Sequence, residues 1–308
     1  MSSPNVIVFG PTGSVGSITA LTAHTLNATV TLAMRDTTKP IPPNLAQTLN
    51  LMPRLQADLS NPASLHAAVT ASGAKTRLPL PHLPRARPHA RAAPSRALKQ
   101  AGIEFVVFLS SASVNPHHKE QGLHAITPAV ELALADTLGP GGYVAVRPGY
   151  FASNLLLFGR VVAEGGVARM VYPEARFDLV APEDIGRVCG RLLVNKGLSA
   201  ETAVVSLAGP QVLSQGQAVR VLAGVAGTKV EVENFASDEE AVGFVVQNMG
   251  LPEPGARQLV QGFKAAASGG NGLDKSRHEE AVANIKKYGG KEATGIQEWA
   301  EMNKVKFT

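Results

Sequence analysis

Residues 5–16 read Asn-Val-Ile-Val-Phe-Gly-Pro-Thr-Gly-Ser-Val-Gly, and this stretch decides the fold of the 308-residue chain. The β-branched apolar run over residues 5–9 predicts a buried strand. A turn rich in glycine follows it, then a helical pattern over residues 17–26 and a second apolar run over residues 29–33. Strand, glycine turn, helix and strand in this order are typical of the opening unit of a Rossmann sheet. We therefore predict an α/β protein with a doubly wound parallel sheet.

The three glycines of the turn have separate mechanical roles. Gly10 allows a tight turn off the strand, Gly13 lets backbone amides approach a pyrophosphate, and Gly16 lets the helix pack closely on the sheet. The phosphates would then lie at the positive end of the helix dipole. The sequence therefore predicts a dinucleotide site at this turn. The other residues of the turn that we expect to contact the dinucleotide are Thr12, Ser14 and Val15.

The end of the second predicted strand, Met34-Arg35-Asp36, indicates which dinucleotide binds. An arginine at this place pairs with the 2′-phosphate of NADP, whereas an acidic residue holds the ribose 2′-hydroxyl of NAD. Arg35 therefore favours NADP(H), and Asp36 beside it is a competing signal for NAD.

Asp58 follows a short third strand expected over residues 53–57. One interpretation puts Asp58 at the carboxyl edge of the sheet, where it meets the adenine amino group. The other makes it part of the N-cap region of a helix over residues 62–70, with Ser60 or Asn61 as the cap. The sequence leaves both open.

Composition narrows the class of protein. Hydrophobic residues make up 44% of the chain, which excludes wholesale disorder. The only cysteine, Cys189, excludes an internal disulfide framework. No apolar stretch is long enough for a transmembrane helix, and no basic patch precedes the first apolar run, so we expect a cytoplasmic protein without a membrane span. The net charge of +5 suits an anionic small molecule, and because aromatic residues are only 5% of the chain we expect no nucleic acid partner.

Residues 74–96 do not fit the pattern of a Rossmann sheet. They read AKTRLPLPHLPRARPHARAAPSR, in the place where a fourth buried strand is due. Proline removes a donor from the strand ladder, so we expect the fourth strand to be defective here. Two interpretations stay open: a long basic loop over the cofactor, and a local frame error in the coding sequence that is restored near Ala97.

A strand predicted over residues 104–109 runs into Ser110-Ser111-Ala112-Ser113. Serine hydroxyls at the carboxyl end of such a strand lie beside the reactive ring of the cofactor and can polarise a carbonyl. We assign Ser110 to cofactor binding, and Ser111 and Ser113 to catalysis. The alternative is that these hydroxyls only satisfy loop amides.

Several motifs together resemble the NmrA-like family, an atypical branch of the short-chain dehydrogenase/reductase superfamily. They are the glycine turn with Arg35, the strand ending in Ser110-Ser111, Arg147-Pro148-Gly149-x-Phe151-x-x-Asn154, Pro182-x-Asp184-Ile185-Gly186, and the run 209–214. The resemblance covers residues 4–235 apart from the Pro/Arg segment. It implies an NADP(H)-binding Rossmann domain, a smaller C-terminal α/β part and a substrate cleft between them. The family includes both reductases and sensors of the dinucleotide redox state.

The resemblance also places residues in the site. We expect a Rossmann domain over residues 1–155, joined by 177–208, and a substrate or lid domain over 156–308. Pro148 and Tyr150 would contact the cofactor, and Phe151 and Asn154 the substrate. The protein would act as a monomer or homodimer.

The proton relay of the superfamily is altered in this chain. Ordinary members use a tyrosine and a lysine four residues later, whereas here His124 stands at the tyrosine position and Pro128 at the lysine position. Proline has neither charge nor donor, so it cannot replace the lysine. His124 could supply the proton near neutral pH, and His117, His118 and Lys119 in the preceding loop could also approach the ring. The alternative is an ordinary surface or core histidine. We expect no metal, since His117, His118 and His124 have no carboxylate at ligand spacing.

These observations predict an NADPH-dependent oxidoreductase that reduces a small apolar carbonyl or enone. The alternatives are a non-catalytic NADP(H) sensor that binds a regulatory protein, and a redox-neutral isomerase on the same fold.

Overall fold

The computed structural model describes residues 3–78, 92–114, 126–199, 202–269 and 275–308. The chain forms two compact units, and each is described by itself. Unit 1 contains residues 1–148, 182–207 and 283–292, and unit 2 contains residues 149–181, 208–282 and 293–308.

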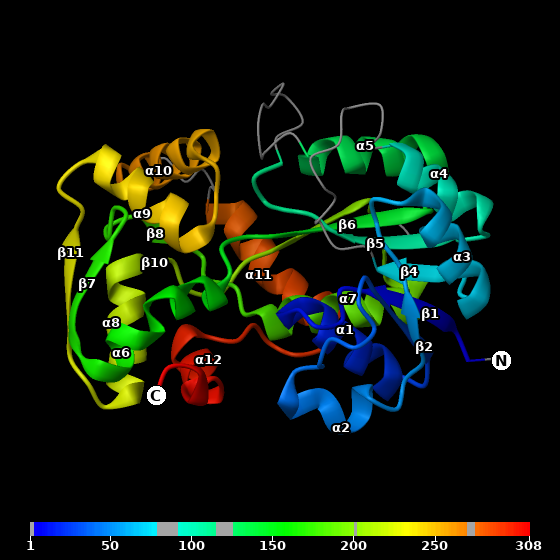
Figure 1. The fold of residues 1–308 in the computed structure, drawn as a ribbon, viewed down its shortest axis with the longest axis horizontal. Coiled ribbons are helices and arrows are strands. Elements are labelled where there is room, and N and C mark those ends of the chain that lie inside the picture. Colours follow the sequence, from blue (N-terminus) through cyan, green and yellow to red (C-terminus); the bar gives the residue numbers. More distant parts are fainter. Residues whose placement is uncertain (1–2, 79–91, 115–125, 200–201, 270–274) are drawn as a thin grey trace. The chain divides into compact units, whose positions relative to one another are not determined.

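Unit 1 is built on a seven-stranded parallel sheet (Figure 1) in the order β3-β2-β1-β4-β5-β6-β9. From β3 at one edge the chain returns to β4 beside β1, so the strand order reverses between β1 and β4, which is where Rossmann sheets bind ligands. The predicted Rossmann-type fold is confirmed. The strands are β1 Asn5–Phe9, β2 Thr29–Met34, β3 Arg54–Gln56, β4 Thr76–Leu78, β5 Phe105–Leu109, β6 Tyr143–Pro148 and β9 Val204–Leu207.

Helices cover both faces of this sheet (Figure 1). On one face α3, α4 and α5 pack against the strands, and Leu65, Leu98 and Leu134 from these helices share a core with Phe9 and Phe108. On the other face α1 packs against α7. The helical segments of unit 1 are α1 Ser14–Thr25, η1 Pro43–Leu45, α2 Ala46–Leu49, α3 Pro62–Ser72, α4 Ala92–Gln100, α5 Ile126–Leu138, α7 Pro182–Val194 and η5 Lys196–Ser199, and α11 Lys275–Gly289 ends in this unit.

Two glycines let α7 approach α1 closely. A Cβ at Gly186 would lie 2.6 Å from the Cβ of Ile18, and a Cβ at Gly190 would lie 2.6 Å from the Cβ of Thr22. Residues four apart lie on one face of a helix, so both glycines meet α1 along a single seam. Because α1 starts at the glycine turn, this seam also fixes the turn.

The fourth strand is present, which corrects the expectation of a defective one. β4 is only three residues long and ends at Leu78, so it is complete before the first proline at position 79. It pairs with β1 over Val6–Val8 and with β5. α4 begins at Ala92 and carries Pro94 in its first turn, where a helix does not use the amide. Residues 79–91 lie outside the described part of the chain, so the nature of that segment stays a prediction.

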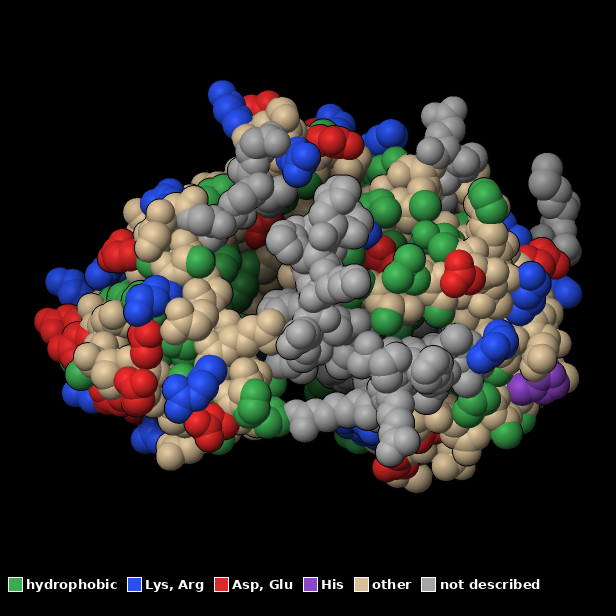
Figure 2. All heavy atoms as spheres, turned by 90° about the horizontal axis from the view of Figure 1, so that it is seen from above, with side chains coloured by type: hydrophobic (Ala, Val, Ile, Leu, Met, Phe, Trp, Pro, Cys, Tyr) green, Lys and Arg blue, Asp and Glu red, His purple; other side chains and the backbone are tan. Residues whose placement is uncertain are grey.

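The outer face of α5 is largely apolar, with one exposed carboxylate, Asp136. Seen from above (Figure 2), hydrophobic side chains gather over this part of unit 1, and Leu132 on α5 is 66% exposed. The helix has two acidic residues, Glu131 and Asp136, and no basic one. Glu131 is 7% exposed, so the helix turns this carboxylate inward, toward the sheet.

Unit 2 contains two small sheets and a core centred on α8 and α12. β7 pairs with β11 in parallel, and β8 pairs with β10 antiparallel. Trp299 is 1% exposed and packs with Leu222 and Met170. The elements are η4 Ala152–Phe158, α6 Gly159–Glu164, β7 Gly166–Met170, β8 Arg176–Phe177, β10 Leu213–Ser214, α8 Gln215–Ala226, β11 Val230–Asn234, α9 Asp238–Met249, α10 Glu253–Ala267, α12 Ile296–Met302 and η6 Lys304–Lys306.

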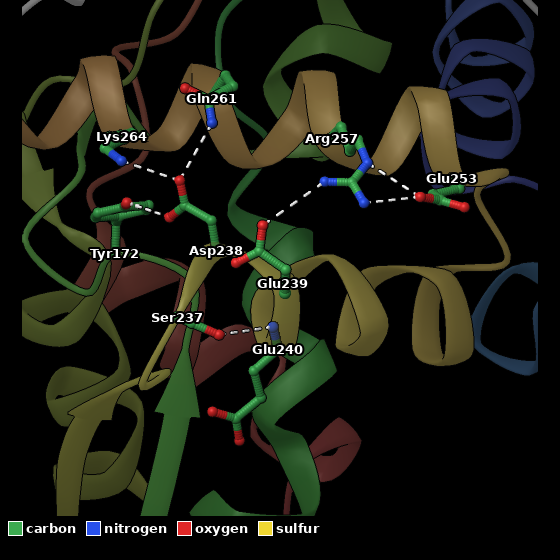
Figure 3. A network of polar contacts seen from close by, with 9 residues as sticks. All are labelled: Tyr172, Ser237, Asp238, Glu239, Glu240, Glu253, Arg257, Gln261 and Lys264. Carbon is green, nitrogen blue, oxygen red and sulfur yellow. Dashed lines mark hydrogen bonds and ion pairs between the residues drawn. The ribbon is translucent and has the colours of Figure 1, made fainter.

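A polar network joins α9 to α10 in unit 2 (Figure 3). Lys264 Nζ lies 2.9 Å from Asp238 Oδ2, and the Tyr172 hydroxyl donates to Asp238 Oδ1 at 2.5 Å. Arg257 on α10 pairs with Glu253 of the same helix at 2.8 Å and with Glu239 on α9 at 3.9 Å. Among the helices that the structure describes, none has the length and apolar character needed to span a membrane.

Candidate functional site

The glycine turn after β1 has the geometry that the sequence predicted. Gly10 has φ +66°, a left-handed conformation that L side chains rarely adopt. The Gly13 amide donates to the Gly10 carbonyl at 3.1 Å and closes the turn. A Cβ at Gly16 would lie 2.3 Å from the same carbonyl oxygen, so no larger residue fits there without moving the backbone.

The amino end of α1 is open to an anion. Gly13 is the N-cap, with no side-chain hydrogen bond to the first amides and no acidic residue in the first turn. A Cβ at Gly13 would come no closer than 3.5 Å to Gly10 O, which is an ordinary contact. Packing therefore does not require glycine at position 13, whereas close approach of a phosphate to the amides of Ser14 and Val15 does.

Arg35 follows β2 at the carboxyl edge of the sheet and is exposed. Its neighbour Asp36 is already engaged, because Asp36 Oδ1 accepts hydrogen bonds from the Thr38 amide at 2.9 Å and from the Thr38 hydroxyl at 2.6 Å. These bonds hold the pKa of the Asp36 carboxyl below its usual value. The guanidinium is thus the group at this edge that is available to a ligand phosphate.

Asp58 follows β3 and combines features of both interpretations of the sequence. Its Oδ1 accepts from the Ser60 amide at 2.8 Å and from the Ser60 hydroxyl at 2.7 Å, and the N-cap of α3 is Asn61, which accepts from Ala63 and Ser64. The Ser60 hydrogen bonds, and further the charge of Arg35, lower the pKa of Asp58. Asp58 is therefore not the cap itself, and it stays a candidate contact for the adenine.

Ser110, at the end of β5, belongs to a buried polar network. Its hydroxyl donates to Glu131 Oε1. Arg147 on β6 donates two hydrogen bonds to the same carboxylate, from Nε to Oε1 at 3.0 Å and from one Nη to Oε2 at 2.5 Å. Ser110 is 6% exposed. Because the Ser110 proton points to Glu131, its lone pairs are left to accept from another group, such as an amide of the cofactor.

Ser111 and Ser113 lie together in the turn after β5. Their hydroxyl oxygens are 2.9 Å apart, and the Ser113 amide donates to the Ser111 hydroxyl at 3.2 Å. The Ala112 amide donates to the carbonyl of Pro148 at 2.9 Å, which anchors the turn to the end of β6. The structure thus brings Ser110, both other serines and Pro148 to one region of the sheet edge. The hydrogen bond from the Ser113 amide shows that Ser111 satisfies a loop amide, and its catalytic role stays a prediction.

The histidines named in the sequence analysis, His117, His118 and His124, lie outside the described residues. Pro128 lies in the first turn of α5, where the absence of an amide proton is harmless. Within the part of the chain that is described, no three His, Cys, Asp or Glu side chains gather in a way that could hold a metal ion.

Tyr150, Phe151 and Asn154 belong to unit 2. The Tyr150 ring stacks on Phe177 with centroids 4.2 Å apart and meets Phe263 edge-on at 6.0 Å. Burial raises the pKa of the Tyr150 hydroxyl to about 12, and a hydrogen bond with Asn154 opposes the shift. Tyr150 is therefore hydrogen-bonded to Asn154 and belongs to an aromatic cluster with Phe177 and Phe263.

One residue that matters here, Asp178, was not singled out from the sequence. Asp178 is 7% exposed, and its Oδ1 accepts the Tyr150 amide at 2.8 Å. A Cβ at Gly149 would lie 1.9 Å from Asp178 Oδ2, so glycine at 149 makes room for this carboxylate. Burial raises the pKa of Asp178. The signal in the sequence is Gly149 itself, but its partner is 29 residues away and only the fold identifies it.

A tyrosine and a lysine do meet in unit 2, at Tyr172 and Lys264 (Figure 3). They meet around Asp238, and the hydrogen bond to that carboxylate raises the pKa of Tyr172. Lys264 itself lowers the pKa of Tyr172, as a relay lysine does, but the Asp238 carboxylate outweighs it and the pKa stays raised. This pair therefore does not replace the missing tyrosine and lysine of the superfamily.

Comparison with known proteins assigns the family. No protein-family model matches the chain. The nitrogen metabolite regulation-like protein bik4 of Gibberella fujikuroi is 33% identical, and the match covers 98% of each chain. The chain belongs to the NmrA-like family.

Solved structures that are similar to this NmrA-like chain have the same fold. A triphenylmethane reductase of Citrobacter sp. aligns with a TM-score of 0.73 and 20% identity, over 97% of this chain and 98% of that one. The NADPH-dependent quinone oxidoreductase QOR2 of Escherichia coli, solved with NADPH, aligns with a TM-score of 0.72 and 21% identity, over 96% and 99%.

Proposed function

We propose that this NmrA-like protein binds NADP(H) and reduces a small apolar carbonyl or enone. The observation that carries the proposal is the open amino end of α1. A ligand reaches it over Gly13, and the packing around Gly13 would tolerate a Cβ, so glycine there favours close approach of a ligand. Two structural neighbours support the same cofactor, since the quinone oxidoreductase QOR2 was solved with NADPH and the Citrobacter sp. triphenylmethane reductase with NADP(H).

The residues of unit 1 suit the parts of such a cofactor. The amides that follow Gly13 would hold the pyrophosphate, with Thr12, Ser14, Val15 and Gly16 completing the turn. Arg35 would pair with the 2′-phosphate and Asp58 with the adenine. Ser110 would accept a hydrogen bond from the nicotinamide carboxamide, beside Pro148. Tyr150 stays a contact of the cofactor that the sequence predicts.

The bound nicotinamide would supply the hydride. Ser111 and Ser113 share a hydrogen bond, so one hydroxyl retains a proton that it can donate to a substrate carbonyl oxygen. His124 is our proposed proton donor. Phe151 and Asn154 would contact the substrate, and the aromatic cluster around Tyr150 suits a flat apolar molecule. We place the protein in the cytoplasm as a monomer or homodimer.

A specific observation favours a second function, that of a dinucleotide sensor. Pro128 occupies the position of the relay lysine, so this chain lacks the group that lowers the pKa of the proton donor. The relative at 33% identity is named for regulation rather than for a reaction. In this alternative NADP(H) binds without hydride transfer and a regulatory protein reads the bound state. A redox-neutral isomerase would use the same pocket.

Titration of the full chain with NADPH and NADP⁺, followed by a panel of quinones, enones and ketones, tests the proposal. A reductase binds NADPH and oxidises it with at least one acceptor, and His124→Ala lowers that turnover. Tight binding with no oxidation across the panel would favour the sensor. Failure to bind either nucleotide at millimolar concentration would overturn both.

A further inference from the structure

Two adjacent residues in the loop after β2 predict different dinucleotides, and the structure shows which side chain is available to a ligand. Arg35 favours NADP and Asp36 favours NAD, and they are adjacent. In the structure one oxygen of the Asp36 carboxylate, Oδ1, accepts from Thr38, from the amide at 2.9 Å and from the hydroxyl at 2.6 Å. The lowered pKa of Asp36 shows that these bonds favour its charged form.

A second residue holds the same loop from outside. Arg54, on β3, donates from one Nη to the carbonyl of Thr37 at 2.9 Å and from the other to Asn50 Oδ1 at 2.5 Å. Asn50 is the C-cap of α2. The guanidinium therefore ties the loop between Arg35 and Thr38 to β3 and to the end of α2. This fixes the backbone that carries Arg35 and Asp36.

The acidic residue across from this loop is restrained in the same way. Asp58 Oδ1 accepts from the amide and hydroxyl of Ser60 at 2.8 and 2.7 Å. The charge of Arg35 contributes to lowering the pKa of Asp58, so the two groups share one region at the ends of β2 and β3. Both carboxylates near Arg35 thus have an oxygen committed to a hydroxyl residue two positions later. Arg35 itself, within the described residues, makes no hydrogen bond or ion pair.

We propose that Thr38 and Arg54 are positioning residues that set the choice of NADP(H) over NAD(H): Thr38 withholds Asp36 from the ribose, and Arg54 fixes the loop so that Arg35 alone meets the 2′-phosphate. The inference rests on the proposed NADP(H) site. Its chemical basis is simple, because a free carboxylate accepts from a ribose 2′-hydroxyl and repels a 2′-phosphate.

The test measures dissociation constants of NADPH and NADH for the full chain by fluorescence titration. Thr38→Val keeps the shape of the side chain and removes its hydroxyl. We expect it to weaken NADPH and to strengthen NADH, each by roughly threefold to tenfold, the scale of one hydrogen bond in water. Thr38→Ser should behave like the wild type. Asp36→Ala added to Thr38→Val should abolish the gain for NADH.

Arg54→Met should weaken NADPH by roughly tenfold while NADH changes less than about twofold, since the 2′-phosphate is the group lost. Arg54→Lys, which keeps one donor, should lie between, and provides the measurement if Arg54→Met does not fold. Arg160→Met is the matched control. It removes an exposed ion pair in unit 2, in which Arg160 Nε lies 3.0 Å from Glu164 Oε1. It should change neither constant.

An unchanged ratio of NADPH to NADH affinity in Thr38→Val would overturn the role of Thr38. Equal loss of both nucleotides in Arg54→Met would reduce Arg54 to a structural residue and overturn its role in selectivity. A wild-type chain that binds both nucleotides equally would refute this inference and leave the dinucleotide site intact. Binding of neither would instead refute the proposed function.

Discussion

Gly16→Ala is the substitution whose outcome follows most directly from the structure. The added Cβ would lie 2.3 Å from the Gly10 carbonyl oxygen and 2.9 Å from the Gly10 carbonyl carbon. Real Cβ atoms essentially never come within 3.0 Å of such atoms, so either the turn or the start of α1 must move by several tenths of an ångström. Forcing atoms into a packed site typically costs about 1–3 kcal/mol of unfolding free energy.

Two matched substitutions separate stability from binding. At Gly13 an added Cβ would meet Gly10 O at 3.5 Å, an ordinary contact, so Gly13→Ala should leave the unfolding free energy within about 0.5 kcal/mol of the wild type. It should still weaken NADPH at least roughly tenfold, because the Cβ stands where a phosphate approaches. Gly224→Ala, in α8 with nothing within 4 Å, should stabilise the chain by about 0.5–1 kcal/mol.

Denaturant unfolding followed by circular dichroism gives the stabilities, and NADPH titration gives the affinities. The expected order of stability is Gly224→Ala above the wild type, Gly13→Ala equal to it, and Gly16→Ala below it. If Gly13→Ala binds NADPH as tightly as the wild type, no phosphate lies at this turn and the reasoning is refuted. If Gly16→Ala is as stable as the wild type, the close approach to Gly10 is not a constraint.

Three further predictions concern buried polar groups. The Tyr150 hydroxyl has a folded pKa near 12 against 10.0 when unfolded, so its contribution to stability, about 3 kcal/mol, is fully present below pH 10 and is lost between pH 10 and 12. Tyr150→Phe should therefore lose less stability than the wild type in alkaline unfolding. Glu131→Gln leaves the Arg147 guanidinium with a neutral partner and should cost about 3–5 kcal/mol in chemical denaturation. The double variant Glu131→Gln/Arg147→Met should cost less than the two single variants together, and a double loss equal to their sum would mean that the pair is not coupled. Gly149→Ala puts a Cβ 1.9 Å from the Asp178 carboxylate and should lower the melting temperature, and Asp178→Ala in that background should recover part of it; no recovery would place the clash elsewhere.

The sequence was sufficient for the parts of this protein that depend on neighbouring residues. The turn over residues 10–16 could be predicted because a left-handed residue and two close approaches each require glycine, and glycine is visible in the sequence. The position of the serines at the carboxyl end of β5 could be predicted for a similar reason, since the apolar run of a buried strand is visible in the sequence and shows where the strand ends. The prediction of a defective fourth strand was wrong, because β4 has only three residues and so shows no hydrophobic pattern of its own. Its pairing with β1 and β5 on either side holds it in the sheet.

What the tertiary structure decided was how distant residues share polar groups. Arg35 and Asp36 give opposite signals, and only the hydrogen bonds of Thr38, with Arg54 on the neighbouring strand, show which of them is available. Glu131 is one acidic residue of a helix in the sequence, and the fold turns it toward Ser110 and Arg147. A carboxylate is exposed or buried, free or paired, according to which strands and helices pack beside it, and sequence neighbours do not record that.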